Sequence, residues 1–202
     1  MGCALALGWF VVRLQGPDGA CSRAVTFGGQ GIGHFREVVR AYRRLGLEAH
    51  ARRAEPLTWP AVWEGVPAYV RTELEPLVDA EEEPLASLRS PERWTSERRF
   101  WGTRSVCASA VGLLVATPRG LLWAASEPRL RPEGLTFGVN VTVVRPDRVV
   151  DAAIGTRGSV GVLRLSSGGP PNPHEMKVPF DPEDIDSAKR IVDIVAGWRG
   201  AP

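Results

Sequence analysis

The feature that most constrains the fold is an apolar hairpin near the middle of the chain. Two apolar runs, residues 112–117 and 121–125, are separated by Pro118, Arg119 and Gly120. Proline fixes one backbone dihedral of a turn, and glycine accepts a conformation that other residues avoid. The pattern therefore predicts two antiparallel strands joined by a tight turn, the first of them buried.

Further strands are predicted on both sides of this hairpin. Each is a short run of apolar or alternating residues bounded by turn-forming proline, glycine or aspartate. The predicted strands are residues 84–89, 137–145, 148–156, 160–166 and 176–180. Short strands with turns every eight to twelve residues or so are typical of antiparallel sandwiches and open barrels.

The hydrophobic period changes after residue 180. Asp181 and Pro182 have the composition of a helix N-terminus, with a capping carboxylate followed by proline. An apolar stripe at helical spacing follows, formed by Ile185, Ala188, Ile191, Val192, Val195 and Trp198. Such a helix is expected to cover an exposed sheet edge or a barrel mouth. We therefore predict an α+β fold, in which a bent antiparallel sheet or open barrel is closed by a C-terminal helix.

The N-terminal part has a different organisation. Strands are predicted at residues 9–14 and 23–27, a helix at 34–45 and a further strand at 47–52. One stripe of this helix is apolar: Phe35, Val38, Val39, Tyr42 and Leu45. The other side carries Arg36, Arg40, Arg43 and Arg44. An arginine-bearing side of an amphipathic helix is expected to face solvent.

Composition divides the chain into three parts. Residues 1–54 form a small α/β unit with an apolar N-terminus, and residues 84–202 contain the predicted sheet and terminal helix. Residues 55–83 are rich in proline and end in an acidic stretch, which indicates a connector. Within the connector, residues 68–77 are expected to form a short helix, with Tyr69, Val70, Leu74 and Leu77 facing inward.

The apolar run at residues 3–12 allows two interpretations. It is about half as long as the roughly 20 residues that a membrane-spanning helix needs, which favours a buried strand. In the alternative it is the end of a membrane helix that begins upstream of Met1, so that the protein would be tethered to a membrane through its N-terminus. The widely spaced Cys3, Cys21 and Cys107 suit a reducing compartment, and we expect a cytoplasmic protein.

Charge and motif content exclude several classes of function. A formal net charge of +2 is too small to indicate a nucleic-acid or membrane-surface partner. No histidines and cysteines have metal-ligand spacing, and no G-x-S-x-G motif is present. His174 has no evident serine or cysteine partner, and Cys107 lies in a predicted strand. We therefore predict no catalytic residue, no metal site and no cofactor.

A glycine-rich segment before the first predicted helix is the one candidate phosphate site. It contains Gly28, Gly29, Gly31 and Gly33. A glycine turn that leads into a helix N-terminus can hold a phosphate, but GGQGIG matches neither the dinucleotide fingerprint nor the P-loop. Residues 28–31 resemble the opening loop of the gamma subunit of 2-oxoacid:ferredoxin oxidoreductases. Small residues before a packed helix also explain the pattern, and nucleotide or flavin binding remains an alternative.

The second half of the chain resembles the bacterial pleckstrin-homology-like domain. The hairpin LVATPRGLLW at residues 114–123, the later paired strands and the terminal helix carry this resemblance, which covers residues 81–199. It implies a strongly bent seven-stranded sheet closed at one end by the C-terminal helix. The chain departs from the family pattern at Gly120, where the family has an arginine, and at residues 130–134, which lengthen a connection.

The resemblance implies a non-enzymatic interaction module. A partner protein or a second copy would dock on the sheet or beside the terminal helix. Some pleckstrin-homology domains also bind phosphoinositides through basic residues in an early loop. The corresponding candidates are Arg98, Arg99 and Arg104, interleaved with Trp94, Phe100 and Trp101. In the other interpretation these aromatic residues pack under the barrel, and the arginines are solvated or paired with Glu92 and Glu97.

Overall fold

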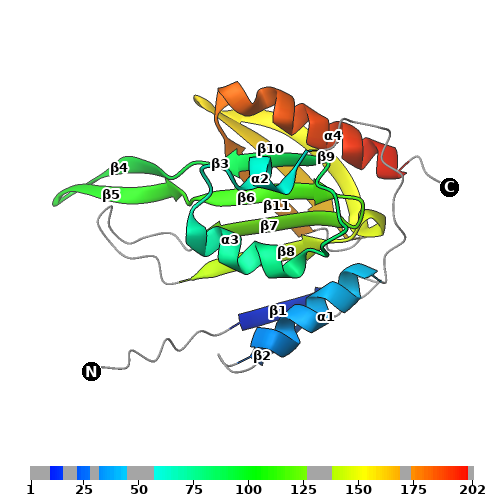
Figure 1. Ribbon diagram of the computed structural model, residues 1–202. Coiled ribbons are helices and arrows are strands. Elements are labelled where there is room, and N and C mark those ends of the chain that lie inside the picture. Colours follow the sequence, from blue (N-terminus) through cyan, green and yellow to red (C-terminus); the bar gives the residue numbers. More distant parts are fainter. Residues whose placement is uncertain are drawn as a thin grey trace.

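The computed structural model describes residues 10–15, 22–27, 32–44, 57–126, 138–168 and 174–199. These residues form an α+β fold with antiparallel sheets and a C-terminal helix, as the sequence predicts (Figure 1). The sheets do not form a closed barrel.

Two antiparallel sheets make up the body of the molecule. The four-stranded sheet has the order β3-β6-β7-β8, and the three-stranded sheet has the order β11-β10-β9. The first consists of β3 (Ala86–Ser90), β6 (Gly112–Thr117), β7 (Gly120–Ser126) and β8 (Val139–Val144). The second consists of β9 (Val149–Arg157), β10 (Val160–Ser167) and β11 (His174–Phe180). A short 3-10 helix, η3 (Pro146–Arg148), joins the two sheets.

The C-terminal helix completes the core between the sheets. Helix α4 (Ile185–Arg199) follows the 3-10 helix η4 (Pro182–Asp184) and contacts both β3 and β9, an edge strand of each sheet. Its stripe is buried as predicted: Ala188, Ile191, Val195 and Trp198 pack with Leu114, Leu163 and Phe180. Burial of each large apolar side chain contributes roughly 1.5–3 kcal/mol before conformational entropy is counted.

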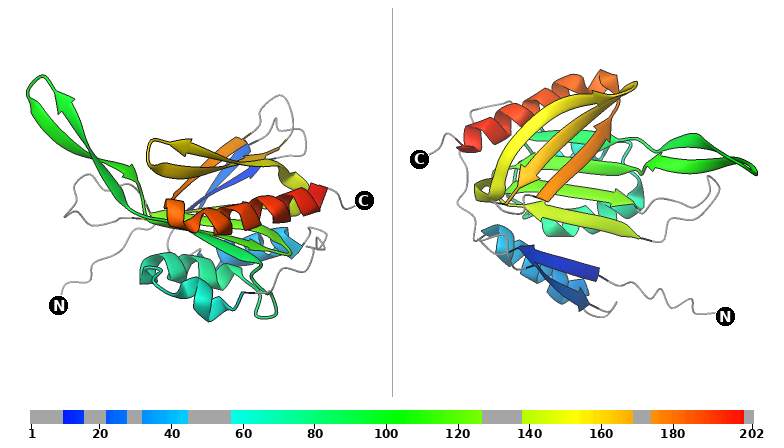
Figure 2. Two further views of the ribbon diagram at one scale, coloured as in Figure 1. Left: turned by 90° about the horizontal axis from the view of Figure 1, so that it is seen from above. Right: turned by 180° about the vertical axis from the view of Figure 1, so that it is seen from behind.

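A second core lies on the other side of the four-stranded sheet. Helices α2 (Trp59–Trp63) and α3 (Ala68–Leu74), with the 3-10 helix η2 (Glu75–Leu77), cover this side (Figure 2). Val62, Val70 and Leu74 pack against Leu113, Val115 and Leu122. Strand β6 is therefore buried on both faces, which explains its unbroken apolar sequence. The part of the predicted connector after residue 56 is thus a helical layer of the fold, and its predicted helix is confirmed.

The N-terminal unit consists of a hairpin and a helix. Strands β1 (Phe10–Gln15) and β2 (Ser22–Phe27) are antiparallel, and α1 (Ile32–Arg44) follows. Phe35 and Val39 of α1 are buried against Leu77, beside Val141 and Val143 of β8. The predicted strand at residues 47–52 lies outside the described residues. Among the described residues, no helix has the length and hydropathy needed to cross a membrane.

The prediction that the arginines of α1 face solvent is wrong for Arg36, Arg40 and Arg43, whereas Arg44 is exposed. Arg36 Nη2 donates to the Thr72 carbonyl at 3.3 Å, and Arg40 Nε donates to the Pro76 carbonyl at 2.7 Å. Arg43 is only 2% exposed. These carbonyls lie at the C-terminal end of α3 and in η2, where helical carbonyls lack partners in their own helix. The basic side of α1 therefore binds the helical layer through hydrogen bonds to its carbonyl groups.

The Arg43 guanidinium has three partners. It forms an ion pair with Glu82, donates to the Leu77 carbonyl and donates to Thr117 Oγ1 at 3.1 Å. Burial lowers the pKa of Arg43, and the carboxylate of Glu82 opposes that shift. Because Thr117 belongs to the central hairpin, this cluster connects three parts of the chain that are far apart in sequence.

The expected capping role of Asp181 is also wrong. Asp181 occupies the N-cap position of η4 but makes no side-chain capping bond. Its carboxylate instead accepts a hydrogen bond from Arg93, which is 88 positions away in the sequence. The carboxylate therefore connects the terminal helical segment to the first residue of strand β4 (Arg93–Arg99).

Candidate functional site

A two-stranded arm extends from one end of the four-stranded sheet. Strands β4 (Arg93–Arg99) and β5 (Gly102–Ser109) pair with each other and with no other described strand. Both views in Figure 2 show the arm projecting beyond the sheets. We call residues 93–109 the arm. The sequence predicted no strands between residues 90 and 103, so the arm corrects that expectation.

The base of the arm is fixed to the body. Arg93 forms the ion pair with Asp181, and Ser109, which is buried, donates from Oγ to the Pro91 carbonyl. Trp94 is half-buried at this end. The side chains become exposed farther out along both strands.

A tight turn forms the tip of the arm. Phe100 and Trp101 connect the last paired residues, Arg99 and Gly102. Neither aromatic residue has a positive φ, and Gly102 takes φ 136°. Glycine adopts this backbone region without the steric penalty that a Cβ brings. The chain thus reverses direction with two bulky residues at its farthest point.

The two aromatic side chains at the tip are almost completely exposed. Phe100 is 92% exposed and Trp101 is 93% exposed. Their rings make an edge-to-face contact, with centroids 5.1 Å apart and planes at 86°. They therefore do not pack under the sheets, and that interpretation of the segment is wrong for this pair. Neither residue belongs to a hydrophobic core cluster of the described residues, so folding does not account for them.

Basic residues stand directly behind the tip. Arg98 pairs with Thr103, and Arg104 pairs with Glu97. Because successive side chains of a strand point to opposite faces, Arg98 and Arg104 lie on opposite faces of the arm. Both are exposed. Arg99, the third candidate arginine, adjoins the turn.

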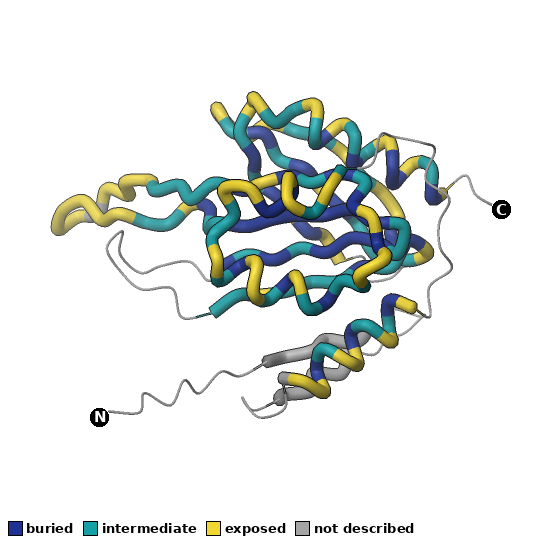
Figure 3. The backbone as a smooth tube through the Cα atoms, viewed as in Figure 1, coloured by how far each residue is buried: buried dark blue, intermediate teal, exposed yellow. Residues whose placement is uncertain are grey.

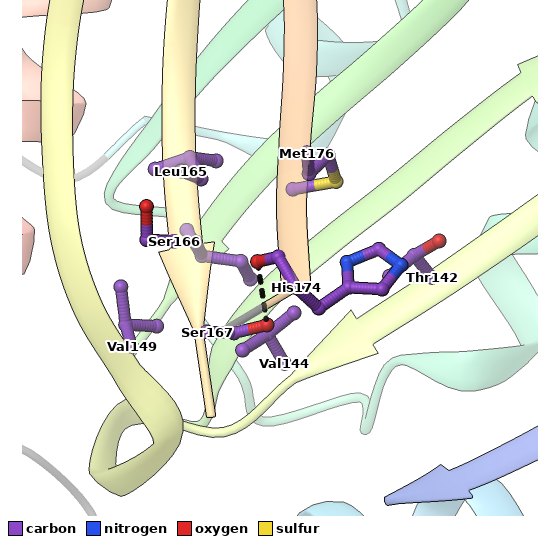
Figure 4. A pocket seen from close by; sticks show the side chains of 9 residues that line it. Thr142, Val144, Val149, Leu165, Ser166, Ser167, His174 and Met176 are labelled. Atoms are coloured by element: carbon purple, nitrogen blue, oxygen red, sulfur yellow. Dashed lines mark hydrogen bonds between the residues drawn. The ribbon is translucent and has the colours of Figure 1, made fainter. Parts of the chain in front are cut away.

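A small cavity lies between the two sheets, beside β8 and β11 (Figure 4). Its volume is about 10 Å³, which is close to the space of one water molecule. Ser167 Oγ donates weakly, at 3.5 Å, to the carbonyl of His174, so the contact does not involve the imidazole. This cavity is too small for a substrate.

An open groove of about 640 Å³ lies on the outside of the helical layer. Trp59 and Trp63 stack there with ring centroids 5.2 Å apart, and Arg71 lies 5.8 Å from the centroid of the Trp63 ring. Arg71 also donates to Glu75 at 3.0 Å, and this hydrogen bond lowers the pKa of Glu75. Two charged groups of the groove, Arg71 and Glu75, therefore already bond to each other, and the two tryptophans stack on one another.

The other sequence-predicted residues are only partly described. Gly33 lies in the first turn of α1 with open space around it, whereas Gly28, Gly29 and Gly31 lie outside the described residues. Cys107 is half-buried in β5, where its Sγ lies 3.2 Å from the Ser109 carbonyl. Within the described ranges, no group of His, Cys, Asp or Glu residues could hold a metal ion.

The tip of the arm is therefore the strongest candidate site. It brings together Arg98, Arg99 and Arg104, which the sequence singled out, with two exposed aromatic residues at a turn. Comparisons with protein-family models, with curated proteins and with solved structures found no match for this chain.

Proposed function

We propose that this chain is a non-enzymatic interaction module that docks through the tip of its arm. The observation that carries the proposal is the nearly complete exposure of Phe100 and Trp101 at the end of a paired, anchored hairpin. Each of these side chains offers roughly 150–250 Å² of mostly apolar surface. Large exposed apolar groups rimmed by polar residues commonly mark interaction sites.

The body of the molecule supports the role of a scaffold. Four strands in one sheet, three in the other and a helix across their edges are compatible with the pleckstrin-homology-like arrangement, and we include that fold in the proposal. In the sequence, the arm is inserted between β3 and β6, which are neighbouring strands of the four-stranded sheet. Under the proposed fold, the arm would take the place of the early loop that some members of the family use for binding.

Photo-crosslinking in cells tests the role of the tip. A photoreactive amino acid replaces Trp101 in the full chain, and in a control it replaces Val150 of β9, an apolar side chain that is 45% exposed. We expect covalent adducts, with protein, with lipid or with a second copy, from position 101 and few from position 150. Equal yields from the two positions, or no adduct from position 101, would contradict docking through the tip.

A further inference from the structure

Building on the proposed function, we propose that the tip of the arm docks in the groove outside the helical layer of a second copy of this chain. The residues of this groove that matter here are Trp59, Pro60, Trp63, Glu64, Arg71 and Glu75, and we call it the tryptophan groove. The tip projects and the groove is hollow. Each combines aromatic with charged side chains, so the chain contains both halves of a contact.

The tryptophan groove has an aromatic lining that the fold holds in place. The rings of Trp59 and Trp63 stack with centroids 5.2 Å apart, and Trp59 Nε1 donates to the Glu82 carbonyl at 2.6 Å. Pro60 adds an exposed apolar side chain. Because these groups are already ordered, docking on them costs little further conformational entropy. The volume of about 640 Å³ is within the roughly 300–1,000 Å³ that is usual for ligand sites.

The charges of the two surfaces are complementary. Residues 95–105 of the arm contain three arginines and one glutamate. The groove contains two glutamates and one arginine, and Arg71 already donates to Glu75. Glu64 is exposed and has no ion-pair partner among the described residues. An arginine of the tip, Arg98 or Arg104, can therefore bind Glu64 without displacing an existing contact.

The arm points away from the groove of its own chain. The groove lies on the helical side of the four-stranded sheet, whereas the arm leans toward the side of the three-stranded sheet (Figure 2). Strand pairing continues from Arg93 to Arg99 and keeps the arm extended. At about 3.3 Å per residue, these residues carry the tip roughly 20 Å from the base. The groove that this tip can reach is that of a neighbouring molecule.

The area of one contact indicates how many contacts a stable assembly needs. Phe100 and Trp101 together offer roughly 300–500 Å², and the groove loses a similar area, so one contact buries about 600–1,000 Å². A stable interface commonly buries roughly 1,200–2,000 Å². Two reciprocal contacts related by a two-fold axis reach this range, and the second forms at a high effective concentration. We therefore expect a dimer with two contacts between tip and groove.

Photo-crosslinking of the purified full chain tests the contact directly. An aromatic photoreactive residue replaces Trp101, and the sample mixes isotope-labelled with unlabelled chains. We expect crosslinked dimers that join labelled to unlabelled chains, with the adducts on residues 59–75. Adducts only elsewhere, adducts only within one chain, or none at all would overturn the proposal.

Sedimentation at increasing protein concentration measures the dissociation constant of the dimer. Phe100→Ser/Trp101→Ser removes the aromatic pair from both contacts and should weaken the dimer about tenfold or more. Val150→Ser is the matched control, because it removes an apolar side chain of β9 that is 45% exposed, and it should leave the dimer unchanged. Both variants should keep the wild-type thermal midpoint, since these side chains are exposed.

A charge exchange tests whether the tip meets Glu64. Arg98→Glu/Arg104→Glu brings like charges together and should weaken the dimer about tenfold or more. Adding Glu64→Arg to this variant should restore at least about threefold of the affinity. Adding Asp193→Arg, which reverses an exposed charge on α4, should restore none. Equal recovery with the two additions would show that net charge, and no specific contact, controls association.

The outcomes separate this inference from the proposed function. A wild-type chain that stays monomeric at every concentration would overturn the dimer. If position 101 nevertheless crosslinks to another protein or to lipid in cells, the second copy is the wrong partner, whereas docking through the tip stands.

Discussion

Arg43 forms a deeply buried ion pair with Glu82. Its side chain and that of Glu82 are each 2% exposed, and burial alone would disfavour both charges. Its further bonds to Leu77 and Thr117 give the guanidinium several partners at once. Removal of one member of the cluster would therefore leave a buried charge or polar group without its partner.

A double-mutant cycle at this pair is the residue-scale prediction. Arg43→Met leaves the Glu82 carboxylate buried without its partner and should lower the free energy of unfolding by about 3–5 kcal/mol. Arg43→Met/Glu82→Leu should lose clearly less than the sum of the two single variants, because neither charge is then left behind. Urea unfolding of the three variants measures the coupling. Additive losses would show that the pair is not coupled.

This cluster could not be predicted from the sequence. The arginines of α1 occupy the polar side of an amphipathic helix, and such a side usually faces water. The groups that bury Arg43 come from residues 77, 82 and 117, and no local pattern brings those residues together. Asp181 shows the same limit, because its partner Arg93 becomes its neighbour only in the folded chain.

Two strand pairs of the protein are joined by tight turns that end in a glycine with positive φ. Gly120 follows Pro118 and Arg119 at φ 120°, as Gly102 follows the aromatic pair in the arm. A Cβ at Gly120 would lie 2.1 Å from the Val144 carbonyl oxygen, so β8 needs glycine here. This close approach accounts for the glycine at position 120.

The element-scale prediction compares two glycine turns. Gly120→Ala adds both backbone strain and a clash with β8, and it should lower the free energy of unfolding by about 2–5 kcal/mol. Gly158→Ala is the control: its φ is 64°, and a Cβ there meets nothing within 4 Å. Strain alone predicts a loss of about 1–2 kcal/mol. Equal losses in thermal or urea unfolding would mean that the contact with Val144 is unimportant.

The buried strands were predictable, and the arm was not. Strands β6, β7 and β10 contain apolar residues because their side chains enter a core, so the sequence pattern reports them directly. The arm is exposed on both faces beyond its base, and its sequence therefore lacks that pattern. The local sequence indicates the arm only weakly, through the threonine and serine residues (Thr95, Ser96, Thr103 and Ser105) that precede and follow the turn at Phe100, Trp101 and Gly102. The three arginines were identified through the family resemblance, but their position behind an exposed turn comes from the fold.

At the scale of the whole molecule, the two sheets and their helices contain the buried residues, whereas the outer part of the arm is exposed. The four-stranded sheet has α2 and α3 on one side and the second sheet with α4 on the other, while the arm extends beyond both layers. Figure 3 shows this contrast as a buried central sheet and an exposed arm tip. The two sheets and their helices thus form the core, and the tip of the arm is an additional surface that contributes no residue to it.

Hydrogen exchange of the full chain, at low and at high protein concentration, tests this account most directly, because it surveys the whole backbone without a preselected site. We predict that high concentration slows exchange at the turn formed by Phe100, Trp101 and Gly102 and in α2, with no change in α4 or β9. Added protection on α4 or β9, with none at the turn, would contradict docking of a second copy through the arm.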